Sequence, residues 1–419
     1  KMHAHSRLNR IVAQLAPNAG LKKANVAGSE DDDVVIVCAL RTAIGKARRG
    51  MFKDTHVEDL LAPVLDAVVK KSNVPVDMIG DVVVGSVLGK NVQRANEARI
   101  ACFMAGLPDT VPVHVVNRQC SSGLQAIAHV AAGIKAGYYD AGIGAGVESM
   151  SSAQMGWQGE INPKIFMDPK TKACLLPMGI TSENVAKKFG VNRKEMDALS
   201  AASHRKAAAA TKAGRFNSEI IPVTTTVKNP KTGKKQQVVV KVDGGIREST
   251  TEQVLARLRP AFDKKGSTTA GNASQVSDGA SAVLVMRESV AKSMGMQVLG
   301  KFKGFAVAGV PPEIMGIGPV PAIRKVLKQT GLTINDIGLF EINEAFASQA
   351  CYCIKELGID MDKVNVNGGA IALGHPLGCT GARMTATLLH EMKRRKCRYG
   401  IVSMCIGSGM GAAAVYELC

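Results

Sequence analysis

The chain has 419 residues, of which 46% are hydrophobic, 4% are aromatic and 43 are glycine, and its net charge is +18. This length suggests two or three domains of about 150 residues each, and no apolar run reaches the ~18 residues that would cross a bilayer. The charge favours anionic ligands, but the basic residues are spread along the chain without interleaved aromatic residues, which argues against nucleic acid as a partner.

Residues 1–28 form a leader that differs in composition from the rest of the chain. It contains five basic residues and no acid, whereas residues 30–33 are all acidic. Four apolar residues of the leader fall on one helical face: Leu8, Ile11, Val12 and Leu15. The pattern fits an amphipathic helix recognised by a receptor, a solvated tail or a mitochondrial-type transit peptide.

From residue 34 onward, strand and helix patterns alternate. The sequence predicts a buried strand at 34–37, a helix at about 57–70, and further strands at 82–84 and 141–146. Such an alternation is typical of an α/β protein in which helices cover a sheet.

Cys120 stands between a β-branched run and a helical pattern. The apolar residues of that pattern recur at steps of three and four: Leu124, Ile127, Ala128, Val130, Ala131 and Ile134. Cys120 is therefore expected at a helix start, where free N–H groups and the helix dipole favour the thiolate over the thiol. We interpret it as a nucleophile, with a buried structural cysteine as the alternative.

The pattern loosens between residues 151 and 267, which suggests an inserted loop domain that covers a ligand. This stretch has polar helical patterns near 182–190 and 193–212 and a basic turn at 229–234. Regular α/β signal returns at 279–286. We predict four parts: a leader (1–32), an N-terminal half (33–150 and 268–297), the inserted loop domain (151–267) and a C-terminal half (298–419).

The last third of the chain resembles the first. A shift of 258 residues superimposes four identities without a gap: Gly123 on Gly381, Lys135 on Lys393, Gly142 on Gly400 and Ile143 on Ile401. The same shift puts Gly378, just after His375, opposite Cys120. We therefore expect two halves related by a pseudo-twofold axis, with loops from both halves meeting at one site.

Three C-terminal segments carry further reactive groups. A strand pattern ends at Asn343, a glycine-rich loop surrounds His375, and Cys405 precedes Gly407 in a second glycine-rich turn. Together with Cys120 they supply a nucleophile, a base, an amide and a second thiol, which are the groups needed for acyl transfer through a thioester. The ten cysteines are irregularly spaced and the eight histidines are scattered, which favours a reducing compartment and gives no support for a metal site.

Four segments resemble the motifs of the thiolases, in the order found in that family. They are residues 117–123 (Asn-Arg-Gln-Cys-Ser-Ser-Gly), 343–346 (Asn-Glu-Ala-Phe), 374–376 (Gly-His-Pro) and 405–409 (Cys-Ile-Gly-Ser-Gly). The match extends over about residues 33–417 and most resembles the peroxisomal 3-ketoacyl-CoA thiolases of plants and animals. The resemblance implies the thiolase fold, in which two pseudo-twofold-related βαβαβαββ halves form a layered αβαβα core with an inserted loop domain.

The resemblance also implies an activity: CoA cleaves 3-ketoacyl-CoA into acetyl-CoA and a chain-shortened acyl-CoA, the last step of fatty acid β-oxidation. In the family's scheme Cys120 carries the acyl group, His375 is its base, Cys405 moves the second proton, and Asn343 and Gly407 support the oxyanions. The family's CoA and pocket contacts fall by position on Arg247, Ser274, Met178 and Phe346. CoA is then a cosubstrate, and no cofactor is permanently bound. A synthetic acetoacetyl-CoA thiolase uses the same residues and is the alternative.

Within the leader, Arg7-Leu8 and Gln14-Leu15 resemble the N-terminal peroxisomal targeting signal of this subfamily. The resemblance implies a homodimeric peroxisomal enzyme that an import receptor binds through this signal, with the mitochondrion as the alternative location. We also raise the hypothesis that Cys174, in the inserted segment, forms a disulfide with Cys120 under oxidising conditions.

Overall fold

The computed structural model describes residues 32–89, 94–153, 155–157, 159–229 and 231–419. The predicted leader helix and its targeting signal lie outside the described residues. No helix in the described ranges combines the length and the apolar character needed to span a membrane.

The N-terminal half contains, in chain order, β1 (Val34–Thr42), α2 (Val57–Ser72), β3 (Ile79–Gly85), α3 (Arg94–Met104), β4 (Val113–Val116), α4 (Ser122–Lys135), β5 (Ala141–Ser149) and β9 (Ser277–Arg287). The C-terminal half contains β10 (Gly300–Gly309), α10 (Pro319–Thr330), β11 (Leu339–Ile342), α11 (Ala347–Leu357), α13 (Leu377–Arg395), β12 (Tyr399–Ile406) and β13 (Met410–Glu417). The order of strands and helices is the same in both halves, except that a single bridge between Phe340 and Val364 stands where the N-terminal half has β4. The predicted strands at 34–37, 82–84 and 141–146 and the helices at 57–70 and after Cys120 are confirmed.

The strands of the two halves join edge to edge in one sheet. Its order is β11-β12-β13-β10-β1-β9-β5-β3-β4, with the short strands β2 (Gly45–Lys46) and β6 (Ile220–Ile221) beside it. The join between β1 and β10 consists of two residue pairs, Val35 with Lys301 and Ile36 with Gly300. The two halves thus share one sheet through a join of two residue pairs, and each half has its own helical cover.

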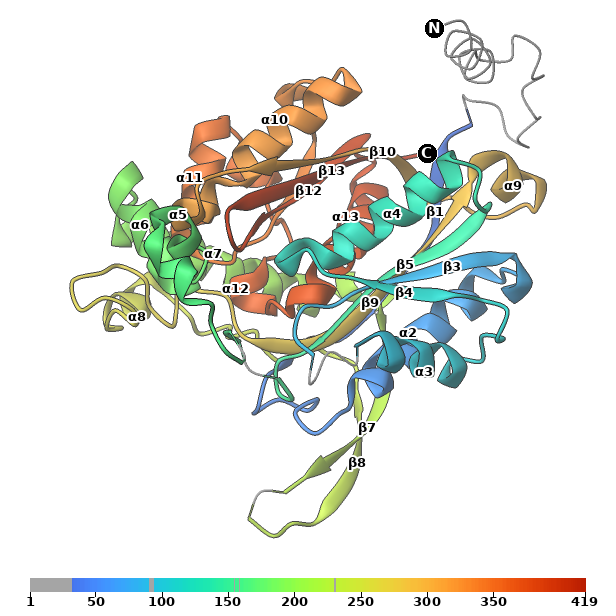
Figure 1. Ribbon diagram of the computed structural model, residues 1–419, viewed down its shortest axis with the longest axis horizontal. Coiled ribbons are helices and arrows are strands. Elements are labelled where there is room, and N and C mark those ends of the chain that lie inside the picture. Colours follow the sequence, from blue (N-terminus) through green and yellow to red (C-terminus); the bar gives the residue numbers. More distant parts are fainter. Residues whose placement is uncertain (1–31, 90–93, 154, 158, 230) are drawn as a thin grey trace, which may run out of the picture.

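The helices α4 and α13 lie side by side in the middle of the molecule, between the strands of the two halves (Figure 1). The helices α2 and α3 cover the other face of the N-terminal strands, and α10 and α11 cover the other face of the C-terminal strands. The result is the αβαβα layering expected for the fold class.

Glycine lets the two central helices approach closely. A Cβ on Gly123 would lie 2.6 Å from the Gly378 carbonyl oxygen, and a Cβ on Gly381 would lie 2.3 Å from the Leu124 nitrogen. Gly123 and Gly381 are the pair that the 258-residue shift superimposes. The repeat read from the sequence therefore corresponds to two equivalent helices that contact each other at equivalent positions.

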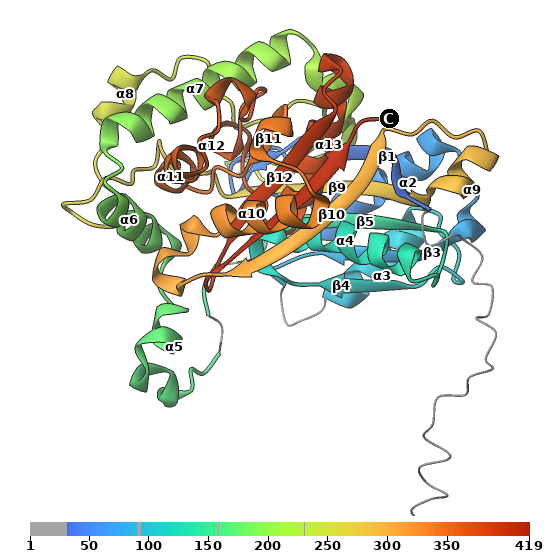
Figure 2. The same ribbon diagram turned by 90° about the horizontal axis from the view of Figure 1, so that it is seen from above.

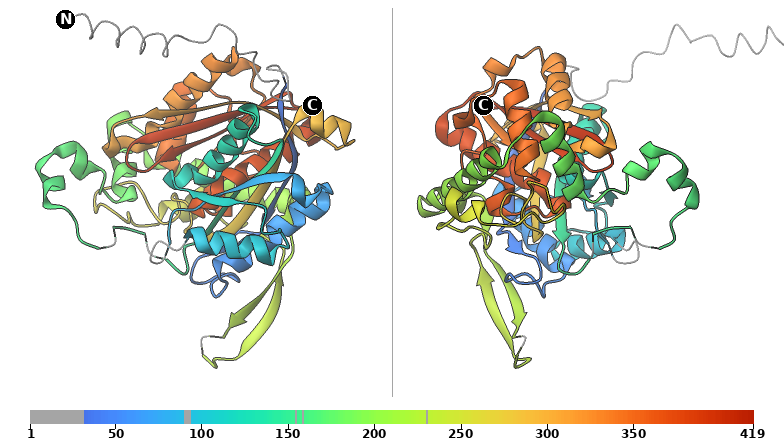
Figure 3. Two further views of the ribbon diagram at one scale, coloured as in Figure 1. Left: turned by 45° about the vertical axis from the view of Figure 1, so that its right-hand side comes forward. Right: turned by 90° about the vertical axis from the view of Figure 1, so that its left-hand side faces the viewer.

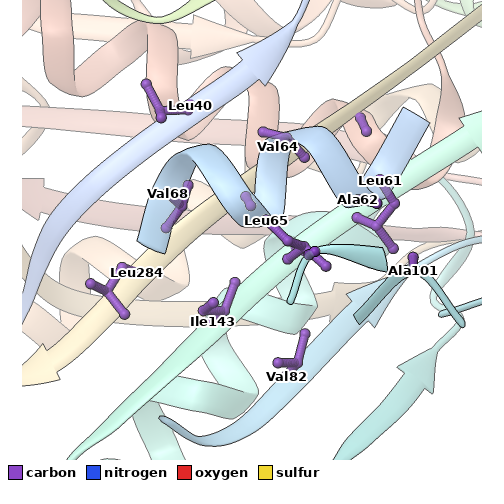
Figure 4. Close-up of a cluster of buried hydrophobic side chains, with 14 of the residues drawn as sticks. Leu40, Leu61, Ala62, Val64, Leu65, Val68, Val82, Ala101, Ile143 and Leu284 are labelled. Atoms are coloured by element: carbon purple, nitrogen blue, oxygen red, sulfur yellow. The ribbon is translucent and has the colours of Figure 1, made fainter. Parts of the chain in front are cut away.

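The core under α2 shows why this segment forms a helix. Leu61, Leu65 and Val68 recur at steps of three and four and are fully buried. They pack against Val82 and Ile143 of the adjacent strands (Figure 4). Burying each such side chain contributes about 1.5–3 kcal/mol, so the helix is fixed on the strands that lead to the site.

The interval between β5 and β9 holds α5 (Pro169–Ala173), α6 (Met178–Phe189), α7 (Arg193–Lys212), β7 (Val223–Lys228), β8 (Lys235–Val240) and α8 (Glu252–Ala256), and α9 (Glu288–Ser293) follows β9. The predicted polar helices are confirmed as α6 and α7, and the basic turn joins β7 to β8. The segment with α5 stands off the body (Figure 2), as does the β7–β8 hairpin (Figure 3).

A buried ionic cluster ties this interval to the central sheet. Arg41 of β1 pairs with Glu219 at 2.6 Å and with Asp243 at 2.7 Å, and all three side chains are at most 1% exposed. Asp243 also accepts a hydrogen bond from the Ile44 N–H at 2.7 Å. The loop after Asp243 is thereby held against the strand end that faces the candidate site.

Candidate active site

Loops from both halves meet at the candidate site. Cys120 lies in the 3-10 turn η2 (Gln119–Ser121) directly before α4, and His375 lies between α12 (Ala370–Leu373) and α13. Asn343 follows β11, which pairs in parallel with β12, the strand that contains Cys405. The Asn343 N–H donates to the Ser403 carbonyl at 2.9 Å, so this amide is fixed beside the strand of the second thiol.

Cys120 is a partly buried free thiol with neighbours from both halves. It packs on an apolar cluster formed by Ala47, Val87, Leu88, Met150 and Leu377. The Gly407 N–H favours the ionised form of its sulfur. The nucleophile candidate of the N-terminal half therefore meets both the turn after β12 and the first residue of α13.

The prediction that the helix start leaves Cys120 as a thiolate is wrong. Burial raises the pKa of this thiol to about 11, and the Glu148 carboxylate acts in the same direction, whereas hydrogen bonds from the N–H groups of Gly407 and Cys120 oppose the rise. The free energy lost when the thiolate is removed from water exceeds the stabilisation that the N–H groups provide. Cys120 is a thiol at neutral pH, so its activation requires a base.

Gly407 occupies a position that leaves no room for a side chain. A Cβ there would lie 2.0 Å from Oε1 of Gln119 and 3.6 Å from Sδ of Met178. Gln119 has a φ of 47°, in the left-handed region that L side chains rarely adopt, and its Nε2 donates to the Ser408 hydroxyl at 3.1 Å. The turn that carries Cys120 is thus fastened to the turn that carries Gly407.

Hydrogen bonds fix the tautomer of the buried His375. The Thr380 hydroxyl donates its one proton to the Pro376 carbonyl at 3.0 Å, so it accepts from Nδ1–H of His375 at 2.7 Å. Nε2 then carries the lone pair and accepts from the Asn343 amide over a long 3.3 Å contact. Oδ1 of Asn343 is buried and has no hydrogen-bond partner among the residues that the structure describes. The arrangement offers one basic nitrogen and one free amide oxygen on the same side of the site.

His375 is held neutral. Burial lowers the pKa of its imidazole to about 3, and the positive charge of Arg383 adds to the effect. Arg383 itself is buried and pairs with Glu341 at 3.3 Å. A neutral imidazole is suited to taking a proton from a thiol as the sulfur attacks, whereas a preformed ion pair would require a charged imidazole.

Cys405 lies in a second apolar cluster, with Met315, Ala345, Phe346 and Met178. Burial raises the pKa of its thiol well above the ordinary value, and the neighbouring Cys120 thiol raises it further. The structure therefore brings the predicted wall residues Met178 and Phe346 to the second thiol.

The loops that carry the predicted CoA contacts lie beside the same site. The Ser274 N–H donates to the Ala345 carbonyl at 3.0 Å, directly before Phe346. The Gln275 side chain donates to the Gly245 carbonyl at 2.9 Å, two residues before the exposed Arg247. The segments of Ser274 and Arg247 are thus joined to each other.

Sequence reasoning missed three residues that shape the site: Gln119, Thr380 and Glu148. Gln119 and Thr380 lie one and five positions from predicted catalytic residues, and nothing in their local pattern indicates a contact. Glu148 did carry a signal, because it is an acid at the end of a glycine-rich strand whose other residues are apolar or small. Cys174 is an exposed free thiol here, and its pairing with Cys120 stays a prediction.

The parts of the chain that the structure describes contain no group of three or more His, Cys, Asp or Glu side chains placed to hold a metal ion. The buried acids near the site are engaged by donors instead. Glu344, for example, accepts from Ser203 at 2.7 Å, from Asn365 at 2.9 Å and from the Ile371 N–H at 3.2 Å. Glu344 therefore fixes the segment after Asn343 against the loop that leads to His375.

Comparison with known proteins gives matches along the whole described body. The model of the thiolase N-terminal domain matches residues 34–289, and that of the thiolase C-terminal domain matches residues 296–418. The chain is 59% identical over 407 residues to 3-ketoacyl-CoA thiolase 1, peroxisomal, of Arabidopsis thaliana, covering 97% of this chain and 92% of the relative. It is 56% identical over 406 residues to 3-ketoacyl-CoA thiolase B, peroxisomal, of Mus musculus, covering 96% and 94%. Among solved structures, the dimeric peroxisomal thiolase of Saccharomyces cerevisiae superimposes with a TM-score of 0.85 at 46% identity, covering 94% of this chain and 99% of that chain.

Proposed function

The chain belongs to the thiolase family, and from this premise we propose that it cleaves 3-ketoacyl-CoA with CoA through an acyl group carried on Cys120. It is a 3-ketoacyl-CoA acyltransferase of the peroxisome, as in the relatives that match it over nearly their whole length. The observation that supports the assignment of Cys120 is the contact between its turn and the Gly407 turn, where Nε2 of Gln119 donates to the Ser408 hydroxyl at 3.1 Å. It sets an oxyanion donor of one half against the nucleophile of the other.

In the first half-reaction, Nε2 of His375 takes the Cys120 proton while the sulfur attacks the 3-keto carbon. The C2–C3 bond then breaks, and its electron pair leaves with acetyl-CoA as an enolate. The enolate oxygen is stabilised by His375 and by a water bound to the free Oδ1 of Asn343, which has no other partner. The Cys405 thiol protonates the C2 carbon, which leaves an acyl thioester on Cys120 and a thiolate on Cys405.

In the second half-reaction, the Cys405 thiolate takes the proton of the incoming CoA thiol. The CoA sulfur attacks the acyl thioester, and the tetrahedral oxyanion accepts from the N–H groups of Cys120 and Gly407. Cys120 leaves as a thiolate and recovers its proton from His375. A positioned oxyanion donor typically contributes about 3–4 kcal/mol to such a step.

CoA is the cosubstrate, and we assign its anionic part to the loops that join at Gln275. Arg247 is exposed there, and its positive charge is close enough to Lys46 of β2 to lower the pKa of that amine, together with burial and Arg49. The neighbouring positive charges of Lys46, Arg49 and Arg247 fit a phosphate-rich ligand. We assign the pantetheine arm to Ser274, whose N–H donates to the Ala345 carbonyl at 3.0 Å, directly before Phe346.

We also propose a homodimer and an import receptor that binds the leader. The dimer follows from the yeast relative, whose structure is described as dimeric. The receptor follows from the paired Arg7-Leu8 and Gln14-Leu15 of the leader. Sedimentation of the purified protein and import of a fusion with residues 1–28 test these two proposals separately.

A thiolysis series from 3-ketobutyryl-CoA to 3-ketopalmitoyl-CoA tests the proposed direction. We expect CoA-dependent loss of the longer substrates, measured by the absorbance of the 3-ketoacyl-CoA. A preference for the four-carbon substrate alone, with condensation of acetyl-CoA, would favour the synthetic acetoacetyl-CoA thiolase instead.

A further inference from the structure

Glu148 is a fully buried carboxylate at the end of β5 that the proposed mechanism does not use. It accepts hydrogen bonds from the N–H groups of Val87 at 2.9 Å, Leu88 at 3.0 Å and Gly378 at 2.9 Å. The Ser86 hydroxyl donates to it at 3.3 Å. One side chain therefore engages the loop after β3 in the N-terminal half and the first turn of α13 in the C-terminal half.

The hydrogen bonds to Glu148 hold the backbone of residues that line the Cys120 pocket, which we call the pocket walls. Val87, Leu88 and Leu377 belong to the apolar cluster on which Cys120 packs. The N–H groups that Glu148 holds are those of Val87 and Leu88 themselves and of the residue that follows Leu377. The carboxylate thus fixes the backbone of three wall residues that come from two halves of the chain.

Close packing makes this position sensitive to small shifts. A Cβ on Gly378 would lie 2.6 Å from the Ser86 Cα and 2.9 Å from the Val147 carbonyl oxygen. The N–H of Gly378 belongs to the first turn of a helix, where no intrahelical partner exists. The carboxylate therefore supplies the partner that this amide would otherwise lack.

The bonding pattern requires the ionised form of Glu148. Each group that contacts its oxygens is a donor, and Arg94 of α3 adds a positive charge 3.8 Å away. A protonated carboxyl would have to give up one of these bonds. Burial raises the pKa of this carboxyl, while Arg94 and the three N–H groups lower it.

We propose that Glu148 is a positioning residue that holds the two walls of the Cys120 pocket, one from each half, at the distance the acyl-transfer step requires. The inference rests on the proposed function only for the identity of that step. The geometry of the pocket itself can be read from the reactivity of Cys120 without any thiolysis.

The test is Glu148→Gln in the full-length protein, which keeps the shape of the side chain but turns an NH2 group toward its N–H donors. We expect kcat for thiolysis to fall by about tenfold or more with the KM for CoA changed by less than about twofold. Deuterium uptake should rise at residues 86–88 and 377–380. Alkylation of Cys120 by iodoacetamide should shift to lower pH, because a negative charge near the thiol is lost. Among the described residues, the other titratable or charged groups that act on Glu148 or on this thiol are Arg94, Cys379 and Cys405.

A matched control is Glu219→Gln, which removes another buried carboxylate but lies in the Arg41 cluster. It should lower the melting temperature and leave the alkylation profile of Cys120 unchanged. If Glu148→Gln does not fold, hydrogen–deuterium exchange in the wild-type protein is the test. Because one carboxylate accepts from both amides, we expect the Leu88 and Gly378 amides to be protected to the same degree. Unchanged kcat or unchanged uptake in a folded Glu148→Gln protein, or unequal protection of the two amides, would overturn the proposal. Absence of thiolysis in the wild-type protein would instead contradict the proposed function.

Discussion

The two central helices, α4 and α13, begin side by side but bring different groups to the site. The 3-10 turn before α4 carries Cys120, whereas the Gly-His-Pro turn before α13 carries His375. The strands that follow also differ, since the 258-residue shift places Val147 of β5 on Cys405 of β12. A repeated scaffold thus supplies the position, and the residues at its loop ends supply the chemistry.

The comparison also shows how unlike the two halves are in their supporting contacts. In the N-terminal half, Glu148 at the end of β5 holds the pocket walls, whereas the equivalent position in β12 is the apolar Ile406. The C-terminal half supplies instead the N–H of Gly407 and the second thiol. Each half therefore completes the other, and neither contains a full set of reacting groups.

Replacing the proposed nucleophile should have the largest effect on this division of groups between the halves. Cys120→Ser is expected to abolish the acyl adduct and to lower thiolysis by on the order of 10⁴-fold or more, because a serine hydroxyl beside a weak base is a poor nucleophile. Intact mass spectrometry after mixing with a 3-ketoacyl-CoA measures the adduct. Cys351→Ser, which changes another partly buried free cysteine, should retain it. An acyl adduct found on Cys405 would show that the nucleophile belongs to the C-terminal half and would contradict the assignment of Cys120.

Gly407→Ala tests the contribution of the C-terminal turn. The added Cβ would meet Oε1 of Gln119 at 2.0 Å and displace the N–H that faces the Cys120 sulfur. We expect kcat to fall by about 10²-fold or more, the effect of losing one oxyanion donor. Gly309→Ala is the control, since a Cβ there meets nothing within 4 Å. A wild-type kcat in Gly407→Ala would remove this turn from the site.

Thr380→Val tests whether the α13 turn fixes the base. Without the hydroxyl, Nδ1–H of His375 loses its acceptor, and the tautomer with a basic Nε2 is no longer favoured. We expect kcat to drop by about 10-fold to 100-fold, within the range that a general base contributes. Thr380→Ser keeps the hydroxyl and should restore most of the rate. Equal rates in the two variants would show that packing, and not the hydrogen bond, matters at this position.

The pH dependence of kcat/KM tests the neutral state of His375. Its pKa of about 3 in the folded enzyme lies below the ordinary value of 6.5, so the imidazole remains a base in mildly acidic solution. An ordinary histidine would be about 90% protonated at pH 5.5, and the rate would fall about tenfold. We expect no such loss at pH 5.5. An acid limb centred near pH 6.5 would contradict the buried, neutral assignment.

The lowered pKa of His375 also makes the folding stability depend on pH. Because the unfolded chain binds the proton of this histidine more readily than the folded one, the neutral imidazole stabilises the fold above pH 6.5. That contribution is lost progressively as the pH falls from about 6.5 toward 3. Urea titrations between these values measure the loss.

The smallest effect is expected at the edge of the site, on the CoA loop. Arg247→Ala should raise the KM for CoA about fivefold, equivalent to about 1 kcal/mol for an exposed ionic contact, with kcat unchanged. Lys241→Ala, at another exposed cation of the same interval, should leave both constants unchanged. A large fall in kcat for Arg247→Ala would place this residue nearer the reacting atoms than we propose.

The sequence by itself determined the α/β alternation, the repeat of 258 residues and the residue types of the site. Apolar periodicity is a local property, and it located β1, α2, β3, α4 and β5. The four motifs likewise identified Cys120, His375, Asn343, Cys405 and Gly407 as one group before any contact was known.

Only the tertiary structure decided the protonation states and the supporting contacts. The helix start suggested a thiolate at Cys120, yet burial between two halves of the chain raises the pKa of this thiol. The roles of Thr380 and Glu148 depend on distances to His375 and Gly378 that no local pattern encodes. The physical reason is that desolvation and hydrogen bonding are set by whatever the fold packs around a group, and most of those neighbours lie far away in the chain.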